Sequence, residues 1–236
     1  MFEDTSMLLT SGRQYYENLT EAQVALLCRY AQAVLKKNEV MNLTAITEPE
    51  AFWQRHILDS LACAALPECS GRVADVGTGA GFPGAVIAAV RDDAQVTMID
   101  STAKKLAFVQ QSCDELRIDA TTLHARAEEI AHKAEYRERY DFICARAVAN
   151  LASLVELCLP LVRVGGYFAS MKGPDAAEEL AAAKKAISLL GGTVRRSAKY
   201  TLPGGDVREI IIIEKTAPTP QKYPRAGAKI AKKPLA

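Results

Sequence analysis

The sequence DVGTGAGFPG, from Asp75 to Gly84, follows the short β-type run RVADV (72–76) and leads into an apolar helical stretch. Four glycines within eight positions let the backbone turn sharply and let a ligand lie against bare main chain at a helix N-terminus. A dinucleotide fingerprint reads G-x-G-x-x-G and holds a diphosphate on the helix dipole. Here the first three glycines are spaced G-x-G-x-G, and Asp75 stands two residues before the first of them, at the end of the strand. A carboxylate at this position favours a cationic ligand group.

Around this loop, short apolar runs with β propensity alternate with helical stretches. The predicted strands are RVADV (72–76), QVTMID (95–100), TTLHA (121–125), YDFICA (140–145) and GYFASM (166–171). The predicted helices span residues 84–90, 102–117, 127–133, 151–159 and 174–190. This regular β-α-β order predicts right-handed crossovers and a parallel sheet with helices on both faces.

The end of the series breaks this order. The runs TVRRSAKYTL (193–202) and VREIIIIEK (207–215) are separated only by residues 203–206, a turn too short for a crossover helix. The predicted fold class is therefore α/β, a doubly wound, Rossmann-like, seven-stranded and mostly parallel sheet with an antiparallel C-terminal hairpin.

Two helices are predicted before the sheet. Thr20 to Gln23 fits a capping box that opens a helix ending near Asn38. A second box, Thr47-Glu48-Pro49-Glu50, opens a helix that continues through Cys63. The chain then divides into an N-terminal helical extension packed on the same domain (1–70), a core that binds the ligand (71–215) and a basic tail (216–236).

Composition narrows the class of protein. The 236 residues are 49% apolar and 24% charged, which is typical of a globular chain and excludes a disordered or coiled-coil protein. No apolar run reaches about 18 residues, and the acidic start of the chain does not fit a signal peptide. We therefore expect a soluble, cytoplasmic protein whose six scattered cysteines are buried free thiols, with no metal site.

Charge is unevenly distributed along the chain. Residues 216–236 carry five basic side chains and no acidic one, while the remainder has 24 basic and 28 acidic residues and a net charge of −4. Such an asymmetry favours contact between the tail and a polyanion, although a basic terminus is also common as a solvated end.

A second acidic position extends the ligand site. Asp100 and Ser101 end the second predicted strand, 25 residues after Asp75, where a carboxylate can hold both hydroxyls of a ribose. Together with Gly77, Gly79 and Gly81, these residues describe an adenosine ligand with a positively charged amino-acid end. That ligand is S-adenosyl-L-methionine, and the sequence resembles a class I methyltransferase. The alternatives are a glycine turn beside a surface aspartate, or a nicotinamide-dependent dehydrogenase.

Further motifs occur in order along the chain. They are Asn42-Leu43-Thr44, Arg55-His56-Ile57-Leu58-Asp59-Ser60, Asp75 to Gly84, Asp100-Ser101, Arg126-Ala127-Glu128-Glu129, Ala145-Arg146-Ala147, Lys172-Gly173, Lys222-Tyr223-Pro224-Arg225 and Lys233-Pro234-Leu235. From about Leu35 to its end, the sequence resembles the bacterial ribosomal small-subunit methyltransferase G family, formerly glucose-inhibited division protein B. The family usually has leucine in place of Phe82 and valine in place of Ala127, which implies altered packing with binding retained.

The resemblance implies methylation of guanine N7 in the conserved decoding-region loop of small-subunit (16S) ribosomal RNA. It also implies that Gly77, Phe82, Ala127, Glu128 and Arg146 line the cofactor. The residues themselves agree for the most part, because Ala127 and Glu128 follow the third strand and are placed to border the adenine. Glu128 is also explained as a helix N-terminal residue favoured by the dipole.

Methylation of guanine N7 requires no strong general base, because this atom has an in-plane lone pair and no proton to lose. Alignment in a dry pocket is the expected source of rate. Arg146 ends the fourth strand, where its guanidinium is placed to hold guanine O6, or alternatively to pair with a carboxylate. The resemblance adds Asn42 and His56 as candidate catalytic residues. Asn42 is equally explained as a turn former, and His56 as a structural histidine hydrogen-bonded to Asp59.

The expected partner is small-subunit ribosomal RNA or the 30S particle, bound by a monomer without a metal ion or a membrane. Phosphate contacts are expected from Arg29, Lys36, Lys37, Arg55, Lys172, Lys222, Arg225, Lys229 and Lys233. Two other functions stay open: a methyltransferase of the same fold that acts on a protein or a small molecule, and a non-catalytic ribosome-assembly factor that keeps the cofactor as a structural support.

Overall fold

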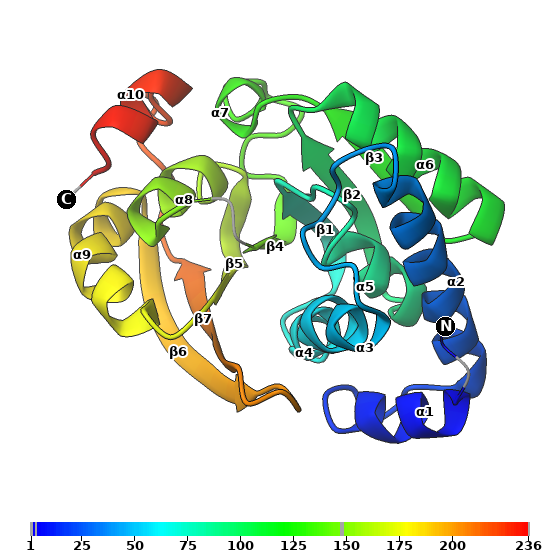
Figure 1. The fold of residues 1–236 in the computed structure, drawn as a ribbon. Helices are drawn as coiled ribbons and strands as arrows, with labels where there is room; N and C mark the ends of the chain where they lie inside the picture. Colours follow the sequence, from blue (N-terminus) through cyan, green and yellow to red (C-terminus); the bar gives the residue numbers. More distant parts are fainter. Residues whose placement is uncertain (1, 3, 147–148, 236) are drawn as a thin grey trace.

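In the computed structural model, which describes residues 2, 4–146 and 149–235, one seven-stranded sheet runs through the molecule (Figure 1). The strands are β1 (Gly71–Val76), β2 (Ala94–Asp100), β3 (Ala120–His124), β4 (Tyr140–Arg146), β5 (Val162–Lys172), β6 (Gly192–Thr201) and β7 (Val207–Lys215). Their order across the sheet is β3-β2-β1-β4-β5-β7-β6. β1 to β5 pair in parallel, whereas β7 is antiparallel to β5 and to β6. The predicted fold class is confirmed.

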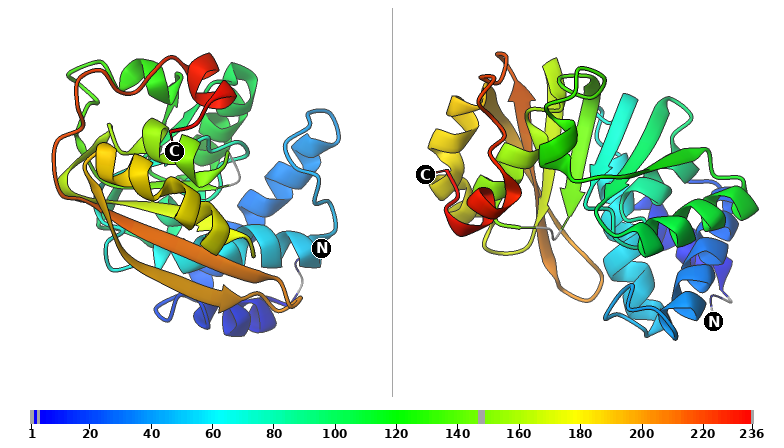
Figure 2. Two further views of the ribbon diagram at one scale, coloured as in Figure 1. Left: turned by 90° about the vertical axis from the view of Figure 1, so that its left-hand side faces the viewer. Right: turned by 90° about the horizontal axis from the view of Figure 1, so that it is seen from above.

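Helices cover both faces of the sheet, as the views in Figures 1 and 2 show. They are α1 (Thr5–Arg13), α2 (Glu21–Asn38), α3 (Pro49–Phe52), η1 (Trp53–Leu58), α4 (Asp59–Ala64), α5 (Gly84–Val90), α6 (Ala103–Leu116), α7 (Ala127–Ile130), α8 (Leu151–Cys158), α9 (Ala176–Leu189) and α10 (Gly227–Lys232). Among the described residues, no helix combines the length and the apolar character needed to cross a membrane.

The two faces of the sheet bury alternate residues of the same strands. On β1, Val73 packs in the cluster formed with α2, α4, α5 and α6, whereas Ala74 and Val76 pack in the cluster formed with α7, α8 and α9. On β7, Ile210 and Ile212 join the first cluster while their neighbours join the second. Successive side chains of a strand point to opposite faces, so a central strand must be apolar throughout. This requirement explains the uninterrupted run IIII in β7.

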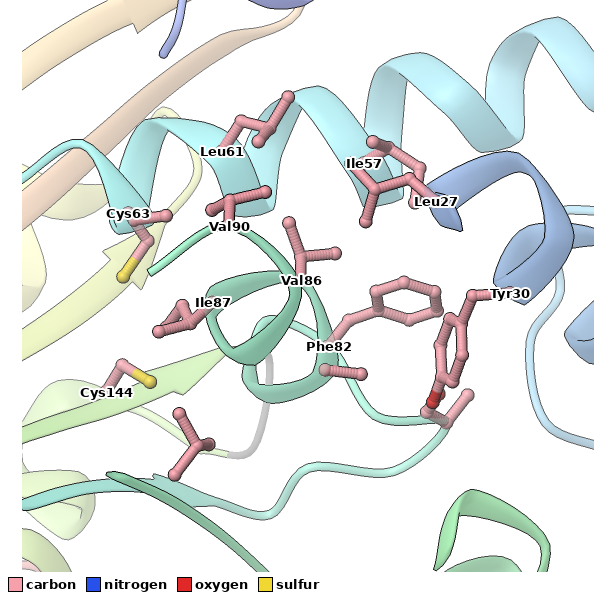
Figure 3. Packing of buried hydrophobic residues seen from close by; sticks show 14 of the residues in the cluster. Leu27, Tyr30, Ile57, Leu61, Cys63, Phe82, Val86, Ile87, Val90 and Cys144 are labelled. Atoms are coloured by element: carbon pink, nitrogen blue, oxygen red, sulfur yellow. The ribbon is translucent and has the colours of Figure 1, made fainter. Parts of the chain in front are cut away.

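The N-terminal helices pack on the first face. Figure 3 shows Ile57 and Leu61 directed toward Val86 on α5, and Tyr30 of α2 beside Phe82. The Tyr30 and Phe82 rings meet edge to face with centroids 5.7 Å apart. One continuous apolar cluster therefore joins the N-terminal segment to the sheet, because both contribute fully buried side chains to it.

Most predicted boundaries agree with the structure to within a residue or two, but β5 begins at Val162, four residues before its predicted start at residue 166. The other differences are local. The Thr20 capping box is present, but the second helix is capped by Glu48, not Thr47: its carboxylate accepts hydrogen bonds from the backbone N–H groups of Glu50 and Ala51. α3, η1 and α4 form one helix with a π-helical turn at residues 53–58. The helix α7 ends at Ile130 instead of continuing to residue 133, while α1 and α10 had no sequence prediction.

Candidate active site

The glycine loop leaves β1 and is held from beneath by Asp75. The Asp75 side chain is fully buried, and its Oδ2 accepts hydrogen bonds from Thr78 Oγ1 at 2.6 Å and from Gly84 N at 2.9 Å. Gly77 adopts φ of 75°, in the left-handed region that favours glycine. The carboxylate expected to face a cationic ligand therefore shapes the loop.

The second oxygen of Asp75 has an unusual environment. Oδ1 is buried and has no hydrogen-bond partner among the described residues. Burial raises the pKa of Asp75 to about 6, although the hydrogen bonds from Thr78 and Gly84 and the charge of Arg146 oppose this shift. A buried carboxylate with an unpaired oxygen gains from a nearby cation, which is a feature that fits the ammonium or sulfonium group of S-adenosylmethionine.

A cavity of about 520 Å³ opens at the carboxyl ends of β1, β2 and β4. Its lining includes seven residues predicted to bind the cofactor: Gly77, Gly79, Asp100, Ser101, Ala127, Glu128 and Arg146. The Asp100 carboxylate accepts hydrogen bonds from Gly79 N at 3.0 Å and from Thr102 N at 2.8 Å, which fixes its orientation at the cavity. Parallel sheets bind ligands where the strand order reverses, and β1 and β4 flank that point here.

The remaining predicted cofactor residues lie behind the loop. Asp75, Gly81 and Phe82 are not part of the cavity lining. A Cβ at Gly81 would overlap the hydroxyl of Tyr30, which donates a hydrogen bond to Ala80 O at 2.9 Å. These residues therefore support the glycine loop against α2.

A second cavity, of about 680 Å³, adjoins the first. Its lining consists of Ile46, Arg55, His56, Asp59, Arg146, Ala149, Asn150, Met171, Lys172, Gly173, Glu179 and Arg208. Arg146 and Ala149 line both cavities, so the two spaces meet at the end of β4. Residues 147 and 148, which include the Ala147 of the Ala-Arg-Ala motif, lie outside the described residues.

Arg146 is held by charge and hydrogen bonds on two sides. Its Nη1 donates to Asp59 Oδ2 at 3.0 Å and to Arg55 O at 2.9 Å, while its Nη2 donates to His56 Nδ1 at 2.8 Å. Pairing of Arg146 with a carboxylate is the alternative to binding guanine O6 that the sequence allows, and the structure shows that this carboxylate is Asp59. The structure does not show the possible hydrogen bond between His56 and Asp59, because the guanidinium of Arg146 bridges them.

His56 is a neutral histidine in this arrangement. Burial and the positive charge of Arg146 lower its pKa to about 3. A guanidinium only donates hydrogen bonds, so Nδ1 of His56 is the acceptor and Nε2 carries the proton that it donates to Thr44 Oγ1 at 2.8 Å. The ring stacks on Phe82 with centroids 4.9 Å apart and planes at 12°. Phe82 therefore packs against His56, with the guanidinium carbon of Arg146 5.6 Å from its ring centroid, and does not line the first cavity.

Asp59 connects this cluster to the last two strands. Its side chain is only 5% exposed, and Oδ1 accepts a hydrogen bond from Tyr200 Oη at 2.7 Å. Arg208 of β7 lies 3.8 Å from the same oxygen. Sequence reasoning missed Thr44, Tyr200 and Arg208 as site residues, because these contacts join positions far apart in the chain and follow no local pattern.

The other candidates are more dispersed. Asn42 is exposed on its connector and lines neither cavity. Arg55 pairs with Asp206 at 2.7 Å, and Lys172 is buried and pairs with Glu179 at 2.8 Å. Arg29 and Lys36 are exposed on α2, Lys37 is half-buried there, and Lys222, Lys229 and Lys233 are exposed in the C-terminal segment. In contrast, Arg225 is bound through Nε and Nη2 to the buried carboxylate of Glu156.

All six cysteines are free and buried. In the part of the chain that the structure describes, no group of three or more histidine, cysteine, aspartate or glutamate side chains converges in a way that suits a metal ion.

Comparison with known proteins identifies the family. Residues 23–203 match the family model described as rRNA small subunit methyltransferase G. Proteins named ribosomal RNA small subunit methyltransferase G are 42% identical in Alkaliphilus oremlandii, over 92% of each chain, and 41% identical in Roseiflexus, over 97% of this chain and 99% of that one. In fold, an O-methyltransferase from Bacillus cereus, solved with S-adenosylhomocysteine (SAH), aligns with a TM-score of 0.56 at 14% identity, covering 79% of this chain and 90% of that one. The chain belongs to the rRNA small subunit methyltransferase G family.

Proposed function

We propose that this chain is a 16S ribosomal RNA (guanine-N7)-methyltransferase that modifies the conserved decoding-region loop of small-subunit ribosomal RNA. Family membership and the names of relatives about 40% identical over nearly the whole chain support a ribosomal RNA substrate. The choice of guanine N7 and of the decoding-region loop rests on the resemblance of the sequence motifs. We further propose that the enzyme acts in the cytoplasm as a monomer.

The observation that carries the proposal is the meeting of two cavities at Arg146. One is lined by the glycine loop, Asp100 and Glu128, which suits the cofactor. The other is lined by four cationic side chains and the two carboxylates Asp59 and Glu179, and this excess of positive charge suits a nucleotide. A methyl donor in the first cavity and a base in the second would approach each other across the end of β4. Such an arrangement favours direct transfer between two bound partners.

The residues of the first cavity fit S-adenosyl-L-methionine, which supplies a methyl group bonded to a sulfonium. In our proposal, Asp100 and Ser101 bind the ribose hydroxyls, and Ala127 and Glu128 border the adenine. Gly77 and Gly79 allow close approach of the backbone. Asp75 acts from beneath the loop, where its buried charge favours the cationic end of the cofactor.

The residues of the second cavity position the base. Guanine N7 attacks with its lone pair, so its bond to the methyl carbon forms as the carbon–sulfur bond breaks, and no proton must be removed. The Nε–H and the remaining Nη2–H of Arg146 have no acceptor among the described residues and are available to guanine O6. Asp59 and His56 orient this guanidinium, and the neutral state of His56 keeps a second positive charge away from the methylated base.

RNA binding in this proposal relies on cations around the second cavity and on those lysines of the C-terminal motifs that are exposed. Arg55 and Arg208 line that cavity, and Lys222, Lys229 and Lys233 add exposed positive charge in the C-terminal segment. Such contacts with phosphate are independent of sequence and weaken with salt. Selection of one guanine then depends on the shape of the folded RNA and on extrusion of the base from its stack.

Transfer of radioactive methyl groups tests the proposal. The purified protein is incubated with labelled S-adenosylmethionine and small ribosomal subunits from a strain that lacks this protein, and RNA and protein fractions are counted separately. We expect label in the RNA. Label in ribosomal protein, or cofactor binding without transfer to any fraction, would replace the proposal by a protein methyltransferase or a non-catalytic assembly factor.

A further inference from the structure

The C-terminal segment returns to the body of the molecule after β7. Arg225 binds the fully buried carboxylate of Glu156 through Nε at 2.8 Å and Nη2 at 2.6 Å, and its backbone N–H adds a third contact at 2.9 Å. His132 and Arg137 hold the preceding residues through the carbonyl groups of Pro224 and Tyr223. A charged pair with this geometry in a buried setting fixes the segment strongly.

The anchored segment ends in α10, which packs beside α8 near α7 (Figures 1 and 2). Gly227, Ile230 and Ala231 of this segment line the same cavity as Gly77, Asp100 and Glu128. Gly227 lies so close to Glu128 that a Cβ there would overlap the carboxylate. The C-terminal segment therefore forms one wall of the first cavity. Its anchor, Arg225, lies only two residues before Gly227, which lines that cavity.

We propose that residues 225–231 are a cofactor-binding element that closes the purine side of the S-adenosylmethionine site. This inference rests on the proposed function, since it concerns the same cavity. Ile230 is almost completely buried and lines the cavity together with Ala127 and Leu157. Apolar side chains from three separate elements suit the faces of a planar aromatic ring, while Glu128 supplies an acceptor for an amino group at its edge.

The charges of the segment distinguish residues suited to cofactor binding from residues suited to RNA binding. Arg225, which is half-buried, is paired with Glu156, whereas Lys229 and Lys232 of α10 are exposed. Binding of the cofactor thus depends on the apolar and small residues of the segment, and any contact with RNA depends on its exposed lysines. The two roles are separable by substitution.

Two exposed alanines on α10 provide a matched pair for the test. Ala231 lines the cavity, whereas Ala228 is exposed on the same helix and does not. In Ala231→Trp the indole occupies space that the purine needs, so isothermal titration calorimetry should show the Kd for S-adenosylmethionine and for SAH raised by about tenfold or more. Ala228→Trp introduces the same side chain and should leave both Kd values within about twofold of the wild type.

A second pair tests the anchor in the full-length protein. Arg225→Ala releases the segment and should raise the Kd for S-adenosylmethionine by about tenfold, whereas Lys232→Ala removes an exposed charge from the same segment without this effect. Thermal unfolding of each variant without ligand shows whether it is folded. If Arg225→Ala is unstable, the Kd of Ala231→Trp alone tests whether the segment binds the cofactor.

Unchanged Kd values in Ala231→Trp and Arg225→Ala would overturn the assignment of the segment to the cofactor site. A wild-type protein that binds neither S-adenosylmethionine nor SAH would instead contradict the proposed function itself. The two failures are therefore distinguishable in one set of titrations.

Discussion

At the scale of the residue, the arrangement around Arg146 determines what the site can do. The Arg146 side chain is only 14% exposed, and its guanidinium bridges a buried carboxylate, Asp59, and a neutral imidazole, His56. His56 accepts from Arg146 and donates to Thr44, so its two nitrogens are both used and it is not a free acid or base. The cluster is built to orient a cation at the boundary of the two cavities.

Stability should depend on pH through His56. Its pKa is about 3 in the folded protein against 6.5 in an unfolded chain, so the unfolded state binds the proton first. The contribution is fully present above about pH 6.5 and is lost as the pH falls from there toward 3. Between pH 7.5 and pH 5 the free energy of unfolding should fall by about 2 kcal/mol more in the wild type than in His56→Gln. Urea titrations at the two pH values measure this difference, and an equal loss in both proteins would mean that His56 is not held neutral. The raised pKa of Asp75 changes the free energy of unfolding in the opposite direction over this pH range. Asp75 is present in both proteins, so its contribution cancels in the difference between them.

Substitution of Asp100 separates cofactor binding from folding. Asp100→Ala removes the carboxylate proposed to hold the ribose, and the Kd for S-adenosylmethionine should rise by about tenfold. Arg146→Ala should instead lower kcat with a smaller effect on this Kd, since Arg146 is proposed to face the base. Calorimetry and steady-state kinetics give both quantities. If the main effect of both Asp100→Ala and Arg146→Ala were an equal loss of thermal stability, the two residues would not have the separate roles proposed for them.

At the scale of the element, two irregular features bring the site together. The π-helical turn η1 lies within the helix that carries His56 and Asp59, a type of irregularity that is frequent at functional sites. The antiparallel hairpin of β6 and β7 lies at one end of the sheet and places Tyr200 and Arg208 beside Asp59. The N-terminal helices and the C-terminal hairpin thus meet over one carboxylate.

Tyr200 should act as a positioning residue through Asp59. Tyr200→Phe removes the hydroxyl that donates to Asp59 Oδ1 at 2.7 Å and leaves the ring in place. We expect a loss of about 1 kcal/mol in the free energy of unfolding and a kcat reduced by several-fold, with the Kd for S-adenosylmethionine unchanged. Tyr15→Phe is a matched control, because among the described residues the Tyr15 hydroxyl donates only to the carbonyl of Thr201. A kcat that falls equally in both variants would show that Tyr200 has no specific link to Arg146.

Sequence reasoning predicted what depends on local pattern. The strands, the glycine loop and the helix after it were predictable because alternation, apolar runs and turn residues are neighbours in the chain. Seven predicted cofactor residues line one cavity because the carboxyl ends of parallel strands meet at one edge of the sheet. The bridge from Arg146 to Asp59 and Tyr200 joins residues up to 141 positions apart, and nothing near Tyr200 in the sequence signals it.

At the scale of the whole molecule, the sheet brings two cavities side by side. Residues 46–59 help to line the second cavity, and α10 helps to line the first. The basic tail illustrates the limit of composition as a guide. Its positive charge predicted an arm for RNA, yet Arg225 is paired with Glu156, which lies 69 residues earlier in the chain, and α10 contributes to the first cavity. Only the fold reveals which charges of the tail are internal partners and which are exposed.

The central claim is that the two cavities serve methyl transfer from S-adenosylmethionine to guanine N7 of small-subunit ribosomal RNA. The most direct measurement is mass mapping of this RNA after incubation of the purified protein, S-adenosylmethionine and small subunits from a strain that lacks the protein. We predict one new methyl group, on guanine N7 in the decoding-region loop, which Arg146→Ala greatly reduces. A methyl group at another atom or another RNA segment, or none in the presence of demonstrated cofactor binding, would contradict the account.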